Sequence, residues 1–258
     1  SEEGKVLLFD REKEIFETIA HREDVTRLWG VVEDEKYIYV GALQHGMYVI
    51  AKEDFAVEYL PNPWKDEQKD ARSMQPYVDT EGNVWIFSFN ISVQVQTEFY
   101  KYDPDTKVMD LAFSFPPEVL FSGPPAVSVV DPGIFFMPSQ TGIVRADVLN
   151  GQMDYLFQAE IGQGNYRLFG VQETVDRELF VAGRNVLGKL EPLTGDYVMY
   201  EGGANEWPVE LFMPVILSNG DLIITGYGGC IRMKSEDLVD DNSILSPFIH
   251  DIRIGDQT

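Results

Sequence analysis

Cysteine, histidine and long apolar runs are all scarce in this chain of 258 residues. The single cysteine, Cys230, excludes an internal disulfide, and the three histidines, His21, His45 and His250, show no metal-ligand spacing. No apolar run reaches the roughly 18 residues that a membrane-spanning helix needs. The sequence therefore predicts no metal, no cofactor and no contact of this segment with a membrane.

The lone cysteine lies in an apolar strand pattern between Gly229 and Ile231, and no histidine lies near it in the sequence. A thiol becomes a nucleophile when a neighbouring base or cation lowers its pKa. A cysteine without such a neighbour behaves as a small hydrophobic side chain. Cys230 is therefore expected to be buried and structural.

Basic residues are few relative to acidic ones. The chain has 20 Lys and Arg against 43 Asp and Glu, which gives a formal net charge of −23. Affinity for nucleic acid comes largely from neutralised phosphates, and anionic membrane surfaces attract basic segments. The charge therefore argues against a nucleic-acid partner, and its main expected effect is solubility.

The chain does contain a repeated phrase. Residues 27–33 read RLWGVVE, and residues 167–173 read RLFGVQE. Each copy leads through a short polar turn into an alternating apolar strand, centred on Tyr39 in the first copy and on Val181 in the second. Self-similarity at a fixed period is typical of repeat architectures.

The same unit recurs along most of the chain. Strand centres at Tyr39, Ile86, Phe136, Val181 and Ile224 are 47, 50, 45 and 43 residues apart. This spacing is near the roughly 40–50 residues of a four-stranded propeller blade, and no window has the periodicity of a long helix. The sequence therefore predicts an all-β fold over residues 1–245, a β-propeller of four-stranded blades with five units and a partial one.

The ends of the chain leave the number of blades open. Residues 5–10 and 15–19 look like the last two strands of an earlier unit, and the last unit shows three strands before residue 235. If the ends close a six-bladed ring, residues 5–19 should pair with the strands around 225–233; otherwise the chain is a fragment of a larger propeller. Five side chains are expected to be buried between blades: Trp29, Val40, Phe169, Val181 and Ile224.

In a propeller, the loop that enters each inner strand and the loop between the second and third strands converge on one face. Here these loops carry aromatic rings, on which a pyranose can stack, and amide or guanidinium donors for its hydroxyls. Arginines also bind carboxylate or sulfate through forked hydrogen bonds. Alternatively, the aromatic residues fill gaps between blades and the arginines bond backbone carbonyls of the next blade. The predicted ligand-binding residues are Arg27, Trp64, Arg72, Tyr166, Arg167, Arg184, Asn185, Trp207 and Tyr227.

No motif predicts catalysis, so no catalytic residue is assigned. Residues 162–164 lack the third glycine of a dinucleotide site, and residues 103–105 lack the glycine and distal glutamate of a calcium loop and are expected to form a turn. A propeller enzyme can gather its groups from separate blades around the channel. A lyase or lactonase therefore stays open as an alternative, as does a protein-interaction scaffold with no small ligand.

The unit pattern resembles the regulator-propeller repeat, which builds the periplasmic sensor regions of hybrid two-component regulators in Bacteroides-type bacteria. The segments that carry this resemblance are 30–50, 75–88 and 220–233, while the unit at 131–137 lacks the expected tryptophan. Residues 246–258 resemble the step into the family's tyrosine-rich, Ig-like domain, or form a C-terminal tail.

That resemblance implies a role for the chain. It implies a periplasmic sensor propeller that recognises an oligosaccharide or helps to shape a homodimer of the full-length sensor. The arginines of the loop face would suit an acidic oligosaccharide. A kinase would lie elsewhere in that protein, so this domain is not expected to be an enzyme.

Overall fold

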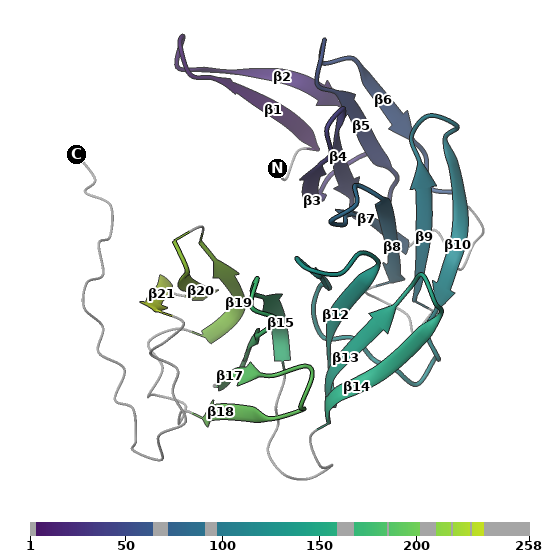
Figure 1. Cartoon of the computed structure of the whole chain (residues 1–258). Coiled ribbons are helices and arrows are strands. Elements are labelled where there is room, and N and C mark those ends of the chain that lie inside the picture. Colours follow the sequence, from purple (N-terminus) through teal and green to yellow (C-terminus); the bar gives the residue numbers. More distant parts are fainter. Residues whose placement is uncertain are drawn as a thin grey trace. The chain divides into compact units, whose positions relative to one another are not determined.

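The computed structural model describes residues 4–63, 72–90, 97–158, 168–184, 186–201, 210–217, 219–227 and 229–234. These residues form strands joined by turns (Figure 1). None of them is in a helix, so the described part of the chain offers no helix long and apolar enough to cross a membrane. The predicted domain boundary at residue 245 lies outside the described residues.

Five of the sheets repeat one plan, in which strands that are consecutive in the chain are hydrogen-bonded neighbours. We call these sheets blades 1 to 5. Blade 1 contains β3 (Leu28–Glu33), β4 (Tyr37–Ala42), β5 (Met47–Ala51) and β6 (Val57–Leu60). Blade 2 contains β7 (Arg72–Val78), β8 (Val84–Asn90), β9 (Glu98–Asp103) and β10 (Val108–Ser114). Blade 3 contains β11 (Ala126–Val127), β12 (Ile134–Ser139), β13 (Gly142–Asp147) and β14 (Gln152–Gln158).

Blade 4 contains β15 (Leu168–Glu173), β16 (Leu179–Gly183), β17 (Val186–Leu190) and β18 (Tyr197–Glu201). In blade 5 the described strands are β19 (Glu210–Ile216), β20 (Asp221–Tyr227) and β21 (Gly229–Lys234). A sixth, two-stranded sheet pairs β1 (Lys5–Asp10) with β2 (Ile15–His21). The five repeated sheets confirm the predicted strand plan of the units.

One backbone hydrogen bond closes the turn after the inner strand of every blade. The residue directly after the inner strand donates its N–H to a carbonyl at the first residue of the second strand or the one before it. The donors and acceptors are Asp34 N and Tyr37 O (3.0 Å), Asp79 N and Asn83 O (3.1 Å), Ser128 N and Ile134 O (2.8 Å), Thr174 N and Glu178 O (2.8 Å), and Leu217 N and Asp221 O (2.8 Å). These equivalent bonds confirm the period that the sequence predicted.

The chain divides into two compact units. The first comprises residues 1–120, 127–134 and 147–152, and the second comprises residues 121–126, 135–146 and 153–258. In the first unit, Tyr39 and Met47 of blade 1 pack with Met74 and Ile86 of blade 2. In the second unit, a separate core joins blades 4 and 5, and its fully buried members are Phe180, Ala182, Leu187, Leu222 and Ile224.

The predicted core residues divide into three that are buried and two that are not. Val40, Val181 and Ile224 are at most 1% exposed, as predicted. Phe169 is only half-buried, and the prediction was wrong for Trp29, which is 40% exposed.

The exposure of Trp29 comes from a β-bulge in β3. Leu28 pairs with Ala42, and the next pairing joins Val31 to Val40, so two residues face Gly41. Gly30 takes the positive φ of 82° in this bulge. An extra residue in one strand breaks the side-chain alternation and re-aims the neighbouring side chain. Strict alternation therefore mispredicted which face Trp29 would take.

Cys230 also differs from the prediction, because it is exposed. It lies on β21, where exposed and half-buried residues alternate from Cys230 on, and β21 is an edge strand among the described strands of blade 5. An apolar strand pattern leads to burial only where another strand or sheet covers it.

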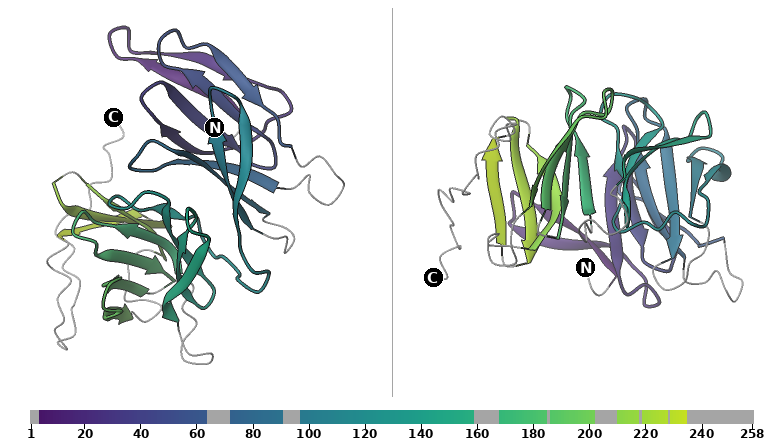
Figure 2. Two further views of the ribbon diagram at one scale, coloured as in Figure 1. Left: turned by 45° about the vertical axis from the view of Figure 1, so that its right-hand side comes forward. Right: turned by 90° about the horizontal axis from the view of Figure 1, so that it is seen from below.

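The hairpin of β1 and β2 packs on blade 1 within the first unit (Figure 2). Ala20 and Val25 join Val40 and Ile50 in one cluster of buried residues. Apolar side chains also remain exposed on this hairpin: Leu7 is 48% exposed and Phe16 is 67% exposed. Ring closure by these strands stays a prediction.

Candidate functional site

The two loops expected to converge do so at the entrance of blade 1. The loop between β4 and β5 donates from Leu43 N to the carbonyl of Arg27, the residue before β3, at 3.0 Å. Its next residue, Gln44, donates from its backbone N to Ser73 Oγ at 3.1 Å, and Ser73 belongs to the inner strand of blade 2. These bonds fix both loops to the sheet beneath them, while the side chains of Arg27 and Gln44 are exposed.

Arg72 lies beneath this face rather than on it. Its Nη1 forms a 2.5 Å ion pair with Glu98 Oε2 of β9, and the two side chains are only 5% and 13% exposed. The same Nη1 lies 3.4 Å from Ser88 Oγ of β8, and Tyr100 donates to Glu98 Oε2 at 2.7 Å. The guanidinium therefore links three strands of blade 2, which favours the structural alternative for this arginine.

A second carbonyl contact ties the loop after blade 1 to blade 2. Asn62 Nδ2 donates to the carbonyl oxygen of Arg72 at 2.9 Å, and Asn62 is only 8% exposed. The loop that enters blade 2 is thus held at its first residues. The backbone carbonyls of Arg27 and Arg72, at the starts of two inner strands, thus both accept a hydrogen bond that holds a neighbouring loop.

The remaining predicted residues are placed only in part. Arg184 is exposed in the turn that follows β16, the position equivalent to Leu43 in blade 1, and it belongs to the second unit. Tyr227 is the last residue of β20. The other predicted ligand-binding residues, Trp64, Tyr166, Arg167, Asn185 and Trp207, lie outside the described residues and stay predictions.

Trp29 is a candidate that the sequence pattern missed. Its indole Nε1 donates to Gln75 Oε1 of β7 at 3.2 Å, and its ring centroid lies 6.5 Å from that of Phe89. Two residues on, Val31 is 66% exposed. The signal in the sequence was the Trp29-Gly30 pair, since a glycine directly after an aromatic residue permits the positive φ of a bulge.

A charged cluster lies close to the same loop. Arg22 donates from Nε and Nη2 to both carboxylate oxygens of Asp24, each at 3.0 Å, and its guanidinium lies 4.1 Å from the ring centroid of Tyr59. The hydrogen bond from Arg22 is the main cause that lowers the pKa of Asp24. Tyr59 Oη in turn accepts from Gly46 N at 3.0 Å, so the cluster supports the loop that carries Gln44.

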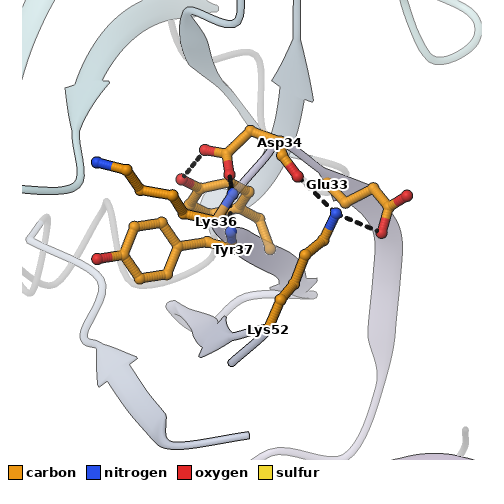
Figure 3. Close-up of polar contacts among 6 residues, drawn as sticks. Glu33, Asp34, Lys36, Tyr37 and Lys52 are labelled. Atoms are coloured by element: carbon orange, nitrogen blue, oxygen red, sulfur yellow. Dashed lines mark hydrogen bonds and ion pairs between the residues drawn. The ribbon is translucent and has the colours of Figure 1, made fainter. Parts of the chain in front are cut away.

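The opposite end of blade 1 has a different polar cluster (Figure 3). The Asp34 carboxylate accepts from the backbone N–H groups of residues 36 and 37, both at 2.7 Å, and from Tyr39 Oη at 2.6 Å. Lys52 Nζ donates to the Asp34 carbonyl at 2.5 Å and pairs with Glu33 at 3.0 Å. Burial, aided by the bond to Asp34, raises the pKa of Tyr39. The hydrogen bonds that the Asp34 carboxylate accepts hold the turn between β3 and β4.

Within the part of the chain that the structure describes, no group of three or more His, Cys, Asp or Glu side chains could hold a metal ion. Blade 1 offers the exposed guanidinium of Arg27 and the amide of Gln44 on loops tied to the sheets, and the exposed indole of Trp29 on β3. Such an arrangement can bind a polar ligand that also has an apolar surface.

Comparison with solved structures shows the fold class. The chain is similar to the extracellular domain of a one-component system from B. thetaiotaomicron, with 15% identity and a TM-score of 0.64 over 91% of this chain and 32% of that one. It is also similar to streptogramin B lyase, with 12% identity and a TM-score of 0.65 over 91% of this chain and 74% of that one. A protein of unknown function from Bacteroides caccae matches over 90% of this chain and 87% of its own, at 14% identity and a TM-score of 0.58.

These similarities, together with the five repeated sheets, show an all-β propeller fold with five blades of the four-stranded type. The chain spans about a third of the one-component system's extracellular domain, 32% of its length. No family model matches the sequence, and no curated protein matches it.

Proposed function

We propose that this chain is the ligand-sensing propeller of an extracytoplasmic signalling protein and that it recognises a glycan fragment. The observation that carries the proposal is the tied pair of loops that exposes Arg27 and Gln44. Guanidinium and amide groups are planar and carry several donors, which suits the neighbouring hydroxyls of a sugar. Because the loops are already bonded to the sheet, little ordering is needed when a ligand binds.

The cellular context of the proposal comes from the resemblance to regulator-propeller repeats and from the shared fold. An extracellular domain of a one-component system has the same fold, which supports a periplasmic location and a sensor role in a two-component-type protein. The full-length sensor is proposed to be a homodimer. The other predicted ligand-binding residues are kept in the proposal, Trp64 within the first unit and the rest within the second: Tyr166, Arg167, Arg184, Asn185, Trp207 and Tyr227.

Arg72 has a supporting role in this proposal. Its buried pair with Glu98 holds the inner strand of blade 2, to which the Gln44 loop is bonded through Ser73. Substitution of Arg72 should therefore weaken ligand binding only by disturbing blade 2.

We also propose that β1 and β2 are the third and fourth strands of a sixth blade. Their turn matches the turn between β9 and β10. Asp10 and Asp103 each accept, through Oδ1, from the backbone N–H groups two and three residues on, and Glu14 and Lys107 close the turns with φ of 54° and 61°. The exposed Phe16 on this hairpin would be covered in a complete blade. Hydrogen exchange of β1 in the full-length protein should then be slow; fast exchange along β1 would argue against a sixth blade.

This domain is further proposed to bind its ligand without transforming it. The Asp34 and Asp79 carboxylates, which end two inner strands, accept hydrogen bonds that shape the turns and so are engaged in the fold. The fold is also that of streptogramin B lyase, which keeps a lyase as the alternative. Chromatography of saccharides incubated with the purified chain should show them unchanged, and a new product would favour the lyase.

A thermal-shift screen against an oligosaccharide library tests the binding proposal. A ligand at a hundred times its dissociation constant stabilises the folded state by about 2.7 kcal/mol. For a chain of this size that corresponds to a rise in melting temperature of about 5–11 °C. A screen in which no saccharide raises the melting temperature, with a protein partner doing so instead, would favour the interaction scaffold.

A further inference from the structure

Trp29 is displayed at the surface by the bulge in β3, although the strand pattern would place it inside. Its side chain is 40% exposed, whereas Tyr39, Val40 and Ala42 of the paired strand are at most 1% exposed. Bulges next to binding sites commonly re-aim a side chain. Exposure of an indole at this position therefore calls for a reason other than core packing.

The exposed indole is also held in one orientation. Its Nε1 donates to Gln75 Oε1 at 3.2 Å, and Gln75 is itself only 8% exposed. Gly30 lies tightly over that amide, since a Cβ added to Gly30 would be 3.3 Å from Gln75 Cγ. A ring whose only polar atom is bonded to the protein presents an apolar face to solvent, and binding on that face costs little side-chain entropy.

Arg27 comes two positions before Trp29, directly before β3, and its guanidinium has no hydrogen-bond or ion-pair partner among the described residues. Leu28, between the two, packs toward the core of the first unit. Both side chains are exposed, and two residues of extended backbone span at most about 7 Å, so the guanidinium and the indole lie within reach of one sugar ring. In contrast, Arg22, Arg72 and Arg232 are each paired with a carboxylate. An arginine without a carboxylate partner keeps its forked hydrogen-bond donors for an anion.

We infer that Trp29 and Arg27 form a subsite for one anionic sugar ring, which stacks on the indole while its acid group binds the guanidinium. The inference rests on the proposed glycan-sensing function and names a contact within it. A uronate carboxylate and a sulfate ester share the needed chemistry, an acid group on a pyranose ring. Gln75 is the positioning residue, since it acts through Trp29.

The test uses calorimetric titration of the whole chain with three probes: a neutral maltotriose, a trigalacturonate and a sulfated heparin disaccharide. We expect binding of one acidic probe, weakened about 10- to 100-fold by Trp29→Ala and less by Trp29→Phe, which keeps a ring. Arg27→Gln should weaken the acidic probe by a similar factor and remove the salt dependence of its binding. Gln75→Leu should give a smaller loss together with a changed tryptophan emission spectrum. Phe16→Ala, an exposed aromatic residue on β2, is the matched control and should leave affinity unchanged.

The outcomes separate this subsite from the broader proposal. If an acidic probe binds the wild-type chain and Trp29→Ala leaves its affinity unchanged, the subsite is wrong while glycan sensing stands. Preference for the neutral probe, with Arg27→Gln having no effect, also overturns the anionic assignment. If no saccharide in the wider library binds the wild-type chain at all, the proposed function fails and the subsite fails with it.

Discussion

Replacing Glu98 with glutamine tests whether Arg72 is a structural residue of blade 2 or an available ligand-binding cation. The substitution keeps the shape of the side chain and removes its charge. It leaves the Arg72 guanidinium, in a side chain that is 5% exposed, without its carboxylate partner. The exposed pair of Glu58 and Lys107, whose side chains are 48% and 54% exposed, provides a matched control through Glu58→Gln.

The expected magnitudes differ by several-fold. Breaking a buried ion pair by removing one partner costs about 3–5 kcal/mol, because the other charge stays buried without compensation. An exposed pair contributes at most about 1 kcal/mol. At about 2–4 °C per kcal/mol for a chain of this size, Glu98→Gln should lower the melting temperature by about 6–20 °C. The control should lower it by less than about 4 °C.

Thermal unfolding followed by circular dichroism measures both variants, and the double variant Arg72→Met with Glu98→Leu completes the comparison. Replacing both charges with apolar groups should destabilise the chain less than Glu98→Gln does, because no buried charge is left over. Equal melting temperatures for Glu98→Gln and Glu58→Gln would refute this reasoning. In that case Arg72 would not depend on Glu98, and the sequence prediction of a ligand-binding arginine would regain support.

Three further predictions concern packing, exposure and ionisation. Gly46→Ala should unfold the chain or destabilise it strongly, since the added Cβ would lie 1.8 Å from Leu60 O. Gly82→Ala, whose Cβ would have no atom within 4 Å, should cost only about 1–2 kcal/mol because of the positive φ at this position. Similar urea midpoints for the two variants would contradict this prediction. Cys230 should react with a maleimide in the native protein as fast as in urea, and protection would show that β21 is covered. Burial raises the pKa of Tyr102 to about 12. The stability that the protonated phenol contributes is therefore present below pH 10 and is lost between about pH 10 and 12. Tyr102→Phe should flatten the fall in melting temperature over that range.

The blade repeat could be predicted from the sequence because it follows from local chemistry. A polar residue at the end of an inner strand, such as Asp79, accepts backbone bonds that start the next strand, and this pattern is visible in the order of residues. Val181 lies in β16, all of whose residues are buried, so its burial follows from an apolar run of strand length. On β20, Leu222 and Ile224 are buried while Thr225 is exposed, so the burial of Ile224 follows from period-two alternation.

What the sequence pattern mispredicted depends on register and on neighbours. The side that Trp29 takes is decided by one extra residue opposite Gly41, and period-two alternation contains no information on that insertion. Cys230 is exposed on β21, which is an outer strand among the described strands of blade 5, and the order of residues does not show which strands cover it. Arg72 and Arg27 are both arginines, but only Arg72 forms a buried ion pair, because Glu98, 26 positions along the chain, lies next to it.

The central claim is that the loop face of blade 1 binds a saccharide, and a crystal structure of the chain with a bound acidic oligosaccharide tests it most directly. We predict a sugar ring stacked on Trp29, an acid group within hydrogen-bond distance of the Arg27 guanidinium, and a hydroxyl near the amide of Gln44. A saccharide bound with none of these three side chains in contact would contradict the account.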